Sequence, residues 1–247
     1  MVMFRPLNIV HFFTDQHRFD MLGCYGNQIV RTPHIGALAA EGVRFNHAYT
    51  PSAICGPARA SLFTGLFPIS HGIRANSEHG DSNPLNIRPD ISNFSQYLKA
   101  YDYYHFGKWH VEETKLPSDY GAKGHDFGGY GFPGSGLYEN FIFDQGPTGN
   151  NPYQKWLEEK GFKVPEVTES YFGENPNLKI QELYARLDGP AEASIPFFLV
   201  DEAADSLKNR KNRDQPFFMS INFWGPHTPC VLPEPYYSMY DPKKIPM

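Results

Sequence analysis

Short apolar segments alternate with helical segments along this chain, and titratable residues follow three of the apolar segments. Leu7–Thr14, Tyr101–Phe106 and Pro216–Asn222 have the length and apolar character of buried strands. Strands that alternate with helices predict an α/β fold, with a sheet between helices on both faces. Ligands bind such sheets beyond the carboxyl ends of the strands, so we expect the polar residues there to converge on one site. These residues are Asp15, Lys108, His110 and His227.

Helix signals occur between the predicted strands. Residues 34–41 follow Thr32 and Pro33 and precede Gly42, which predicts a helix with a threonine N-cap, a proline in its first turn and a glycine stop. Further helices are predicted at residues 57–64, 92–100, 152–160 and around Val200, Ala203, Ala204 and Leu207.

Two segments are less regular. Val43–Tyr49 alternates loosely, and we expect another strand there. Residues 117–150 are rich in Gly, Pro, Tyr and Asp, and we expect a long irregular loop, a feature that often shapes a binding site. The whole chain, residues 1–247, is expected to form part of one domain.

Charge and composition exclude several classes of function. The formal net charge of -5 leaves no basic surface for nucleic acid, so positive charge for an anionic ligand must be concentrated in one cleft. No segment approaches the roughly 20 apolar residues that span a bilayer. No signal peptide is recognisable, so the chain as given is expected in the cytoplasm, or in the periplasm or medium if a leader has been removed. The three cysteines fit neither a zinc motif nor a disulfide framework.

Cys55 stands at the start of the predicted helix 57–64. A cysteine at a helix N-terminus has a lowered thiol pKa and lies where an anion binds. Arg59 lies one helical turn further on and can address the same anion. The alternative from these residues alone is that Cys55 is a small buried apolar residue, as most free cysteines are. Asp15, similarly, is either a hard-cation ligand or the cap of a turn.

The segment from Cys55 to Gly65 resembles the signature of type I sulfatases, in which the cysteine is oxidised to formylglycine. The resemblance extends along nearly the whole chain. Its further motifs are Asn8-Ile9-Val10, Thr14-Asp15-Gln16, Gly23–Asn27, Thr32–Ile35, Leu38–Phe45, His71-Gly72, Gly107-Lys108-Trp109-His110 and Pro226-His227-Thr228-Pro229. The chain is thereby identified as a member of this family, in the alkaline phosphatase-like superfamily.

The resemblance implies a reaction. Formylglycine at position 55 would be hydrated to a geminal diol, held by one divalent cation. Calcium is the first expectation, with magnesium or manganese as alternatives. One hydroxyl attacks sulfur and expels the alcohol, and the second lets the sulfated residue return to the aldehyde, releasing sulfate. Such nucleophilic catalysis divides one difficult step into two. The substrate would be a small-molecule or carbohydrate sulfate ester, and a formylglycine-generating enzyme would be a required partner.

The resemblance also implies roles for individual residues. Asp15, Gln16 and the modified Cys55 would hold the metal. Lys108 would bind the sulfate and the nucleophile's oxygen, and His110 would act on the diol proton, within the titration range of an imidazole. His227 would contact the ester and assist the leaving group. The resemblance also places two further residues in the active site. Arg59 would lie next to the nucleophile, and Asn76 would lie beside the transferred group.

Gln16 departs from the family pattern, because many sulfatases have aspartate at this position. The Asp15-Gln16 pair resembles choline-sulfatase-like and phosphonate monoester hydrolase branches. A phosphonate monoester or phosphodiester hydrolase is therefore the nearest alternative function. A second alternative is an inactive fragment that only binds anions, with Cys55 remaining a thiol.

Members of this family are normally longer, and their second half supplies further metal ligands. We therefore expect an alkaline phosphatase-like sheet that is incomplete at its C-terminal end, with weak metal binding and poor turnover from this polypeptide alone. A calcium ion prefers at least about six oxygen ligands, and few are available here. An incomplete sheet exposes an edge and apolar surface, which favours a homo-oligomer.

Overall fold

A four-stranded parallel sheet lies at the centre of the computed structural model, which describes residues 6–76, 86–112, 114–124, 126–127, 152–172, 182–228 and 230–245. The strands, in spatial order, are β1 (Ile9–Phe13), β6 (Phe217–Asn222), β2 (Asp102–Lys108) and β3 (Asp126–Phe127). Every pairing between neighbours in this sheet is parallel. The three strands predicted from the sequence, β1, β6 and β2, are therefore consecutive neighbours in one sheet.

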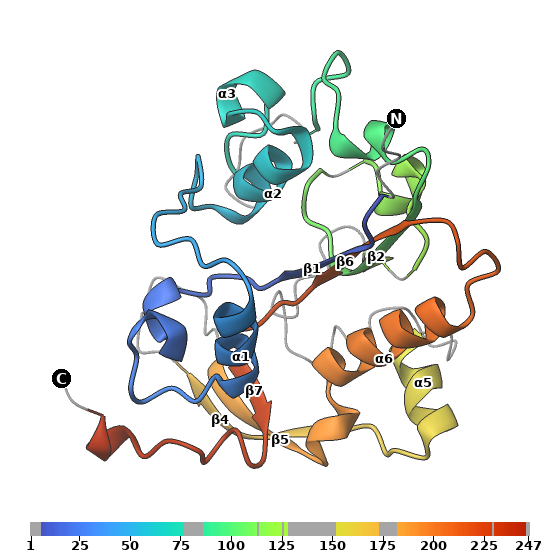
Figure 1. The fold of residues 1–247 in the computed structure, drawn as a ribbon. Coiled ribbons are helices and arrows are strands. Elements are labelled where there is room, and N and C mark those ends of the chain that lie inside the picture. Colours follow the sequence, from blue (N-terminus) through green and yellow to red (C-terminus); the bar gives the residue numbers. More distant parts are fainter. Residues whose placement is uncertain are drawn as a thin grey trace.

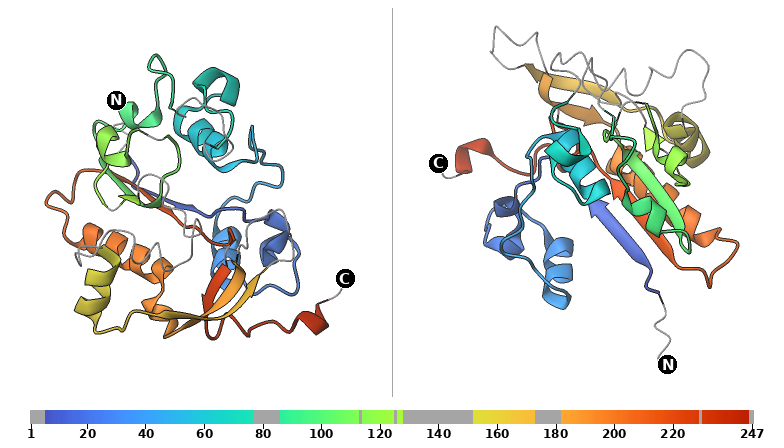
Figure 2. Two further views of the ribbon diagram at one scale, coloured as in Figure 1. Left: turned by 180° about the vertical axis from the view of Figure 1, so that it is seen from behind. Right: turned by 90° about the horizontal axis from the view of Figure 1, so that it is seen from above.

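Helices cover both faces of this sheet (Figures 1 and 2). On one side lie α2 (Cys55–Thr64) and α3 (Pro68–His71), and on the other lie α5 (Pro152–Lys160) and α6 (Ile195–Lys208). The predicted α/β sandwich is confirmed. The remaining α-helix among the described residues, α1 (Pro33–Glu41), begins and ends as predicted, although the Thr32 hydroxyl accepts from the Gly23 amide and does not cap the helix.

Successive side chains of β2 point alternately to the two faces of the sheet. Tyr104 and Phe106 belong to the core that joins the sheet to α5 and α6, while Tyr103 and His105 point to the opposite face. The second core lies under α2 and contains Ala60, Phe63, Ile73, Ile87, Trp109 and Val111. Because side chains alternate across a strand, β2 anchors both layers while its last residue, Lys108, reaches the end of the sheet.

A second, three-stranded sheet has no counterpart in the sequence prediction. It contains β4 (Glu166–Phe172), β5 (Glu182–Asp188) and β7 (Cys230–Pro233), with β5 in the middle. The pairing of β4 with β5 is antiparallel and that of β5 with β7 is parallel. β7 begins three residues after His227, so this sheet fixes the far end of the loop that carries this histidine.

Two predicted elements are wrong. Residues 43–49 form no strand, and the Phe45 carbonyl accepts from the Tyr25 hydroxyl, not from a neighbouring strand. Residues 92–100 contain only the 3-10 turn Phe94–Tyr97, which follows Asn93 as its N-cap, with the Asn93 side chain accepting from the backbone and hydroxyl of Ser95.

Other 3-10 turns cover Phe19–Met21, Gly23–Tyr25, Pro117–Tyr120, Ala191–Ala193 and Pro242–Lys244. The loop predicted at 117–150 thus begins with one of these turns. Its residue 125 and its residues 128–150 lie outside the described residues. None of the helices among the described residues has the length and apolar character needed to cross a membrane.

The prediction that residues 7–14 form a buried strand is wrong in its burial. Within the described part of the chain, β1 pairs with β6 alone and is the edge of the sheet. Ile9, Val10 and Phe12 are consequently 41%, 45% and 58% exposed. An unpaired edge with apolar side chains is a template for association with another strand.

We predict that Val10→Lys reduces self-association of the purified chain, because a charge on the β1 edge opposes strand pairing. Light scattering after size exclusion at several protein concentrations measures the effect. Val43→Lys is the matched control, since Val43 is 81% exposed and lies outside the sheets. Equal association of both variants and the unsubstituted chain would contradict a role for this edge.

Candidate active site

Asp15 lies just beyond the end of β1 and holds two buried cations. Its Oδ2 accepts from Lys108 Nζ at 2.6 Å and from Arg59 Nη2 at 3.1 Å. All three side chains are buried. Arg59 also donates from Nη1 to the Lys108 carbonyl at 3.1 Å, and its guanidinium lies 4.9 Å from the centre of the Phe13 ring. The ends of β1 and β2 are thus joined to α2 through one carboxylate.

The Asp15 carboxylate remains ionised in this setting. Burial by itself raises the pKa of Asp15, but the charges of Lys108 and Arg59 and the Lys108 hydrogen bond outweigh burial and lower it. One carboxylate against two cations leaves a local excess of positive charge. The cleft therefore has the concentrated positive charge that the acidic composition requires for an anionic ligand.

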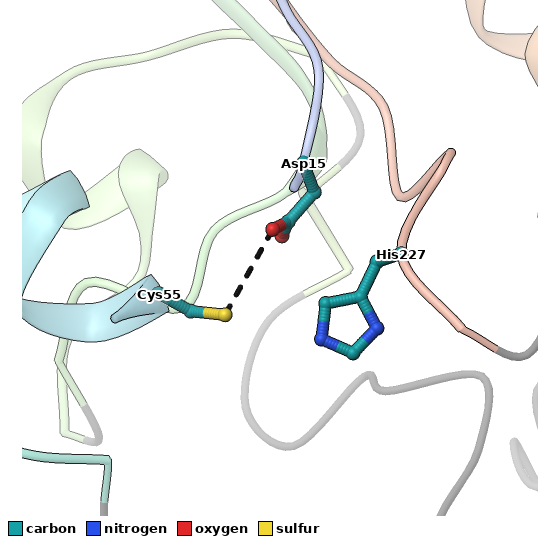
Figure 3. A group of neighbouring side chains, drawn as sticks. All are labelled: Asp15, Cys55 and His227. Atoms are coloured by element: carbon teal, nitrogen blue, oxygen red, sulfur yellow. Dashed lines mark hydrogen bonds between the residues drawn. The ribbon is translucent and has the colours of Figure 1, made fainter. Parts of the chain in front are cut away.

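Cys55 is the first residue of α2, after Ile54 as N-cap, and points toward Asp15 (Figure 3). Its Sγ donates to Asp15 Oδ1 at 3.8 Å. Burial raises the pKa of the Cys55 thiol, but a hydrogen bond with His110 and the charge of Lys108 outweigh this effect and lower it. The direction agrees with the lowered pKa that the sequence predicts, but its causes are His110 and Lys108 and not the helix N-terminus.

Asn76 lies at the N-terminus of α2 beside the nucleophile position. Its Oδ1 accepts from the Gly56 amide at 2.9 Å, which satisfies one of the donors that the first turn of a helix leaves unpaired. The Gly56 amide is therefore already bonded within the protein. It is not free to bind an anion, as an unpaired amide in the first turn of a helix would be. The structure brings Asn76 to the site through the backbone of α2.

His227 completes the convergence of the three strand ends. Single ligand atoms of Asp15, Cys55 and His227 all lie within 4.8 Å of one another, on segments after β1, at the start of α2 and after β6 (Figure 3). His227 Nδ1 lies 2.5 Å from the Thr228 carbonyl oxygen. Since a carbonyl only accepts, Nδ1 carries the proton of the neutral ring and Nε2 is the basic nitrogen.

Two of the predicted site residues have left-handed backbone conformations. Gln16 has φ 56° and His110 has φ 47°, and such conformations in residues other than glycine cluster at functional sites. Gln16 is exposed and, together with Asp15 and Cys55, lines a cavity of about 670 Å³. The turn at Gln16 therefore places two adjacent oxygen-bearing side chains, Asp15 and Gln16, at one cavity.

The arrangement provides the components of nucleophilic substitution at an anionic centre. It has a residue with an activated sulfur at position 55, two buried cations and two imidazoles, those of His110 and His227. Carboxylate and amide oxygens suit a hard cation, and Asp15, Gln16 and an oxygen on residue 55 fit part of such a coordination shell. Sequence reasoning did not find the pairing of Arg59 with Asp15, because helix spacing places Arg59 near Cys55 but carries no information on contacts with β1.

We predict that Lys108→Met raises the pH midpoint for alkylation of the unmodified Cys55 thiol. Removing a cation that lowers the Cys55 pKa leaves the opposing effect of burial in place. Peptide mass spectrometry after timed iodoacetamide treatment measures each cysteine separately. Burial raises the pKa of Cys230, so Cys230 provides an internal reference that reacts at higher pH. Lys123→Met, which removes an exposed cation paired with Asp102, is the control and should leave the Cys55 midpoint unchanged.

Comparison with known proteins places these features in a family. The sulfatase family profile matches residues 7–245. The chain is 32% identical over 243 residues to the uncharacterized sulfatase YidJ of Escherichia coli (strain K12), covering 96% of this chain and 42% of that protein. It is 31% identical over 252 residues to an arylsulfatase of Clostridium perfringens (strain 13 / Type A), covering 97% of this chain and 47% of that protein.

A solved structure shows the same fold. The phosphonate monoester hydrolase of Agrobacterium radiobacter superposes with a TM-score of 0.67 at 22% identity, covering 98% of this chain and 45% of that one. The chain thus spans less than half the length of these relatives. With the family profile matched along almost its whole length, the chain belongs to the sulfatase family.

Proposed function

We propose that this chain carries the nucleophile-bearing part of a sulfuric ester hydrolase that uses formylglycine formed from Cys55. The observation that carries the proposal is the position of Cys55 at the start of α2, with its Sγ 3.8 Å from Asp15 Oδ1 and beside the buried Lys108 and Arg59. The same residue occupies the modified position of the sulfatase signature. The arylsulfatase relative supports a sulfate ester as substrate.

The residues divide the proposed reaction among them. Lys108 and Arg59 hold the anionic ester at the start of α2 through charge-assisted hydrogen bonds, which are stronger than those between neutral groups. One oxygen of hydrated residue 55 attacks sulfur, and the bond from sulfur to the leaving alcohol breaks. The attacking hydroxyl releases its proton to water, and His227, as an imidazolium with a proton on each ring nitrogen, supplies the proton on Nε2 to that alcohol. His110 then accepts a proton from the second hydroxyl, the aldehyde carbonyl re-forms, and the bond from residue 55 to sulfate breaks.

One divalent cation, with calcium as the first candidate, would be held by Asp15, Gln16 and residue 55. When bound, it would supply Lewis acidity and an additional positive charge for the ester. Two of these three residues, Asp15 and Cys55, also belong with His227 to the only group of three His, Cys, Asp or Glu side chains with metal-binding spacing among the described residues. Since calcium takes six to eight oxygens, we propose weak binding by these residues alone.

A phosphonate monoester or phosphodiester hydrolase is the second candidate. The Asp15-Gln16 pair favours it, because this pair resembles the phosphonate monoester hydrolase branches, whereas charge does not separate two esters that each carry one negative charge. Parallel assays with aryl sulfate and aryl phosphonate monoesters discriminate between these two functions. A fragment that binds anions without turnover is the third candidate, and it requires Cys55 to remain a thiol.

We predict that Cys55 becomes formylglycine when the chain is expressed with a formylglycine-generating enzyme. Mass spectrometry of the peptide that contains residue 55 identifies the aldehyde or its hydrate. Cys55→Ser should remain unmodified under the same conditions and hydrolyse no aryl sulfate, because serine has no second hydroxyl with which to release sulfate. Cys230→Ser is the matched control and should leave the modification of Cys55 intact. An unmodified thiol at Cys55 would eliminate the aldehyde mechanism.

We predict that Gln16→Asp tightens calcium binding at least about fivefold, since roughly 1 kcal/mol is expected from one further charge about 4 Å from the ion even at the dielectric constant of water. Calorimetric titration measures the change. Gln16→Asn is the matched control, because asparagine and aspartate both tolerate the left-handed backbone at this position and differ in charge. Equal affinity of the two variants would place the cation away from residue 16.

A further inference from the structure

The segment after α3 returns along α2 and contacts the first turn of that helix. Gly56 is the contact point. A Cβ atom at this position would lie 3.1 Å from Asn76 Oδ1, 3.6 Å from Ile73 Cγ2 and 3.7 Å from the Ala75 carbonyl oxygen. Residues 73–76 therefore pack directly against the backbone that presents residue 55. Asn76 adds the hydrogen bond from the Gly56 amide at 2.9 Å.

His71, at the end of α3, joins this segment to the middle of α2. Its Nδ1 accepts from the Ile73 amide at 3.1 Å, and its Nε2 lies 3.0 Å from Ser61 Oγ. An amide only donates, so Nδ1 has no proton and Nε2 carries it. The imidazole consequently donates to Ser61 on α2 while it accepts from Ile73 on the returning segment.

The bond that His71 Nδ1 accepts from the Ile73 amide requires a neutral ring, and both His71 and Ser61 are buried. His71 is 0% exposed and Ser61 is 6% exposed. Burial lowers the pKa of His71, which favours the neutral form that can accept from Ile73. The His71 carbonyl also accepts from the Arg88 amide at 3.1 Å, so the backbone of this residue is held from a third direction.

We propose that His71 is a positioning residue for the nucleophile. By fixing Ile73 relative to Ser61, it sets the path of residues 73–76, places Asn76 on the Gly56 amide and thereby orients the first turn of α2 with residue 55. His71 contacts neither the substrate nor residue 55 and acts through Asn76. The role rests on the proposed function of residue 55 as nucleophile, but the hydrogen-bond chain that carries it exists in the unmodified protein.

Hydrogen exchange at the Gly56 amide tests the proposal on the thiol form, without turnover or metal. In His71→Leu, both side-chain bonds are lost at similar volume, and Gly56 exchange should accelerate at least about tenfold. His71→Asn retains an acceptor near the position of Nδ1 and should restore most of the protection. Ser61→Ala removes only the bond between His71 Nε2 and Ser61. We expect it to accelerate exchange of the Gly56 amide less than His71→Leu does.

Leu157→Ala is the matched control for lost stability, since Leu157 is fully buried in the other core, on α5. Its Gly56 exchange, compared at equal free energy of unfolding, should stay near that of the unsubstituted chain. If His71→Leu accelerates Gly56 exchange no more than Leu157→Ala does, the proposal is wrong. Should His71→Leu fail to fold, the same comparison between Ser61→Ala and Leu157→Ala decides. Absence of formylglycine at position 55 would overturn the proposed function and leave this result unaffected.

Discussion

The buried carboxylate of Asp15 is the interaction on which the rest of the site depends. It accepts from Lys108 at the end of β2 and from Arg59 in the second turn of α2, so three elements distant in sequence are fixed at one point. Breaking a buried ion pair from one side typically costs about 3–5 kcal/mol, because a charge is left without a partner in a medium that solvates it poorly. Lys108 and Arg59 are therefore held in place by the same charge that they stabilise.

The parallel sheet and its covering helices follow from periodicity, and this much of the fold was predictable from the sequence. Apolar runs bounded by polar clusters identified β1, β2 and β6 because such strands are specified locally. The second sheet was missed because the pairing of β5 with β7 joins segments that are distant in sequence. The exposure of β1 was missed for a related reason, since an apolar run predicts a strand but does not reveal how many neighbours it has.

The candidate site was predictable in its residue types but not in its connections. Strand ends and the sulfatase resemblance identified Asp15, Lys108 and His227. Neither signal predicts that Asn76 bonds to the backbone of α2, because that contact depends on a chain reversal through α3. The left-handed backbone of Gln16 was equally inaccessible, since glutamine has no preference for this conformation. The sequence therefore predicts which residues belong to the candidate site, whereas their contacts and backbone conformations depend on the tertiary structure.

The charge of the cluster formed by Asp15, Lys108 and Arg59 bears on the kind of ester that the proposed active site would accept. Asp15 offsets one of the two buried cations, which leaves one net positive charge among these three side chains before any metal binds. A sulfate monoester and a phosphonate monoester each bring a single negative charge, so both neutralise this excess. In the proposed reaction, a bound divalent cation would add two positive charges that the neutral Gln16 does not offset, so it would favour a doubly charged sulfate product more than a singly charged ester. Strong product binding slows release, so in the proposed reaction Gln16 would shift the balance between capture of the ester and departure of the product.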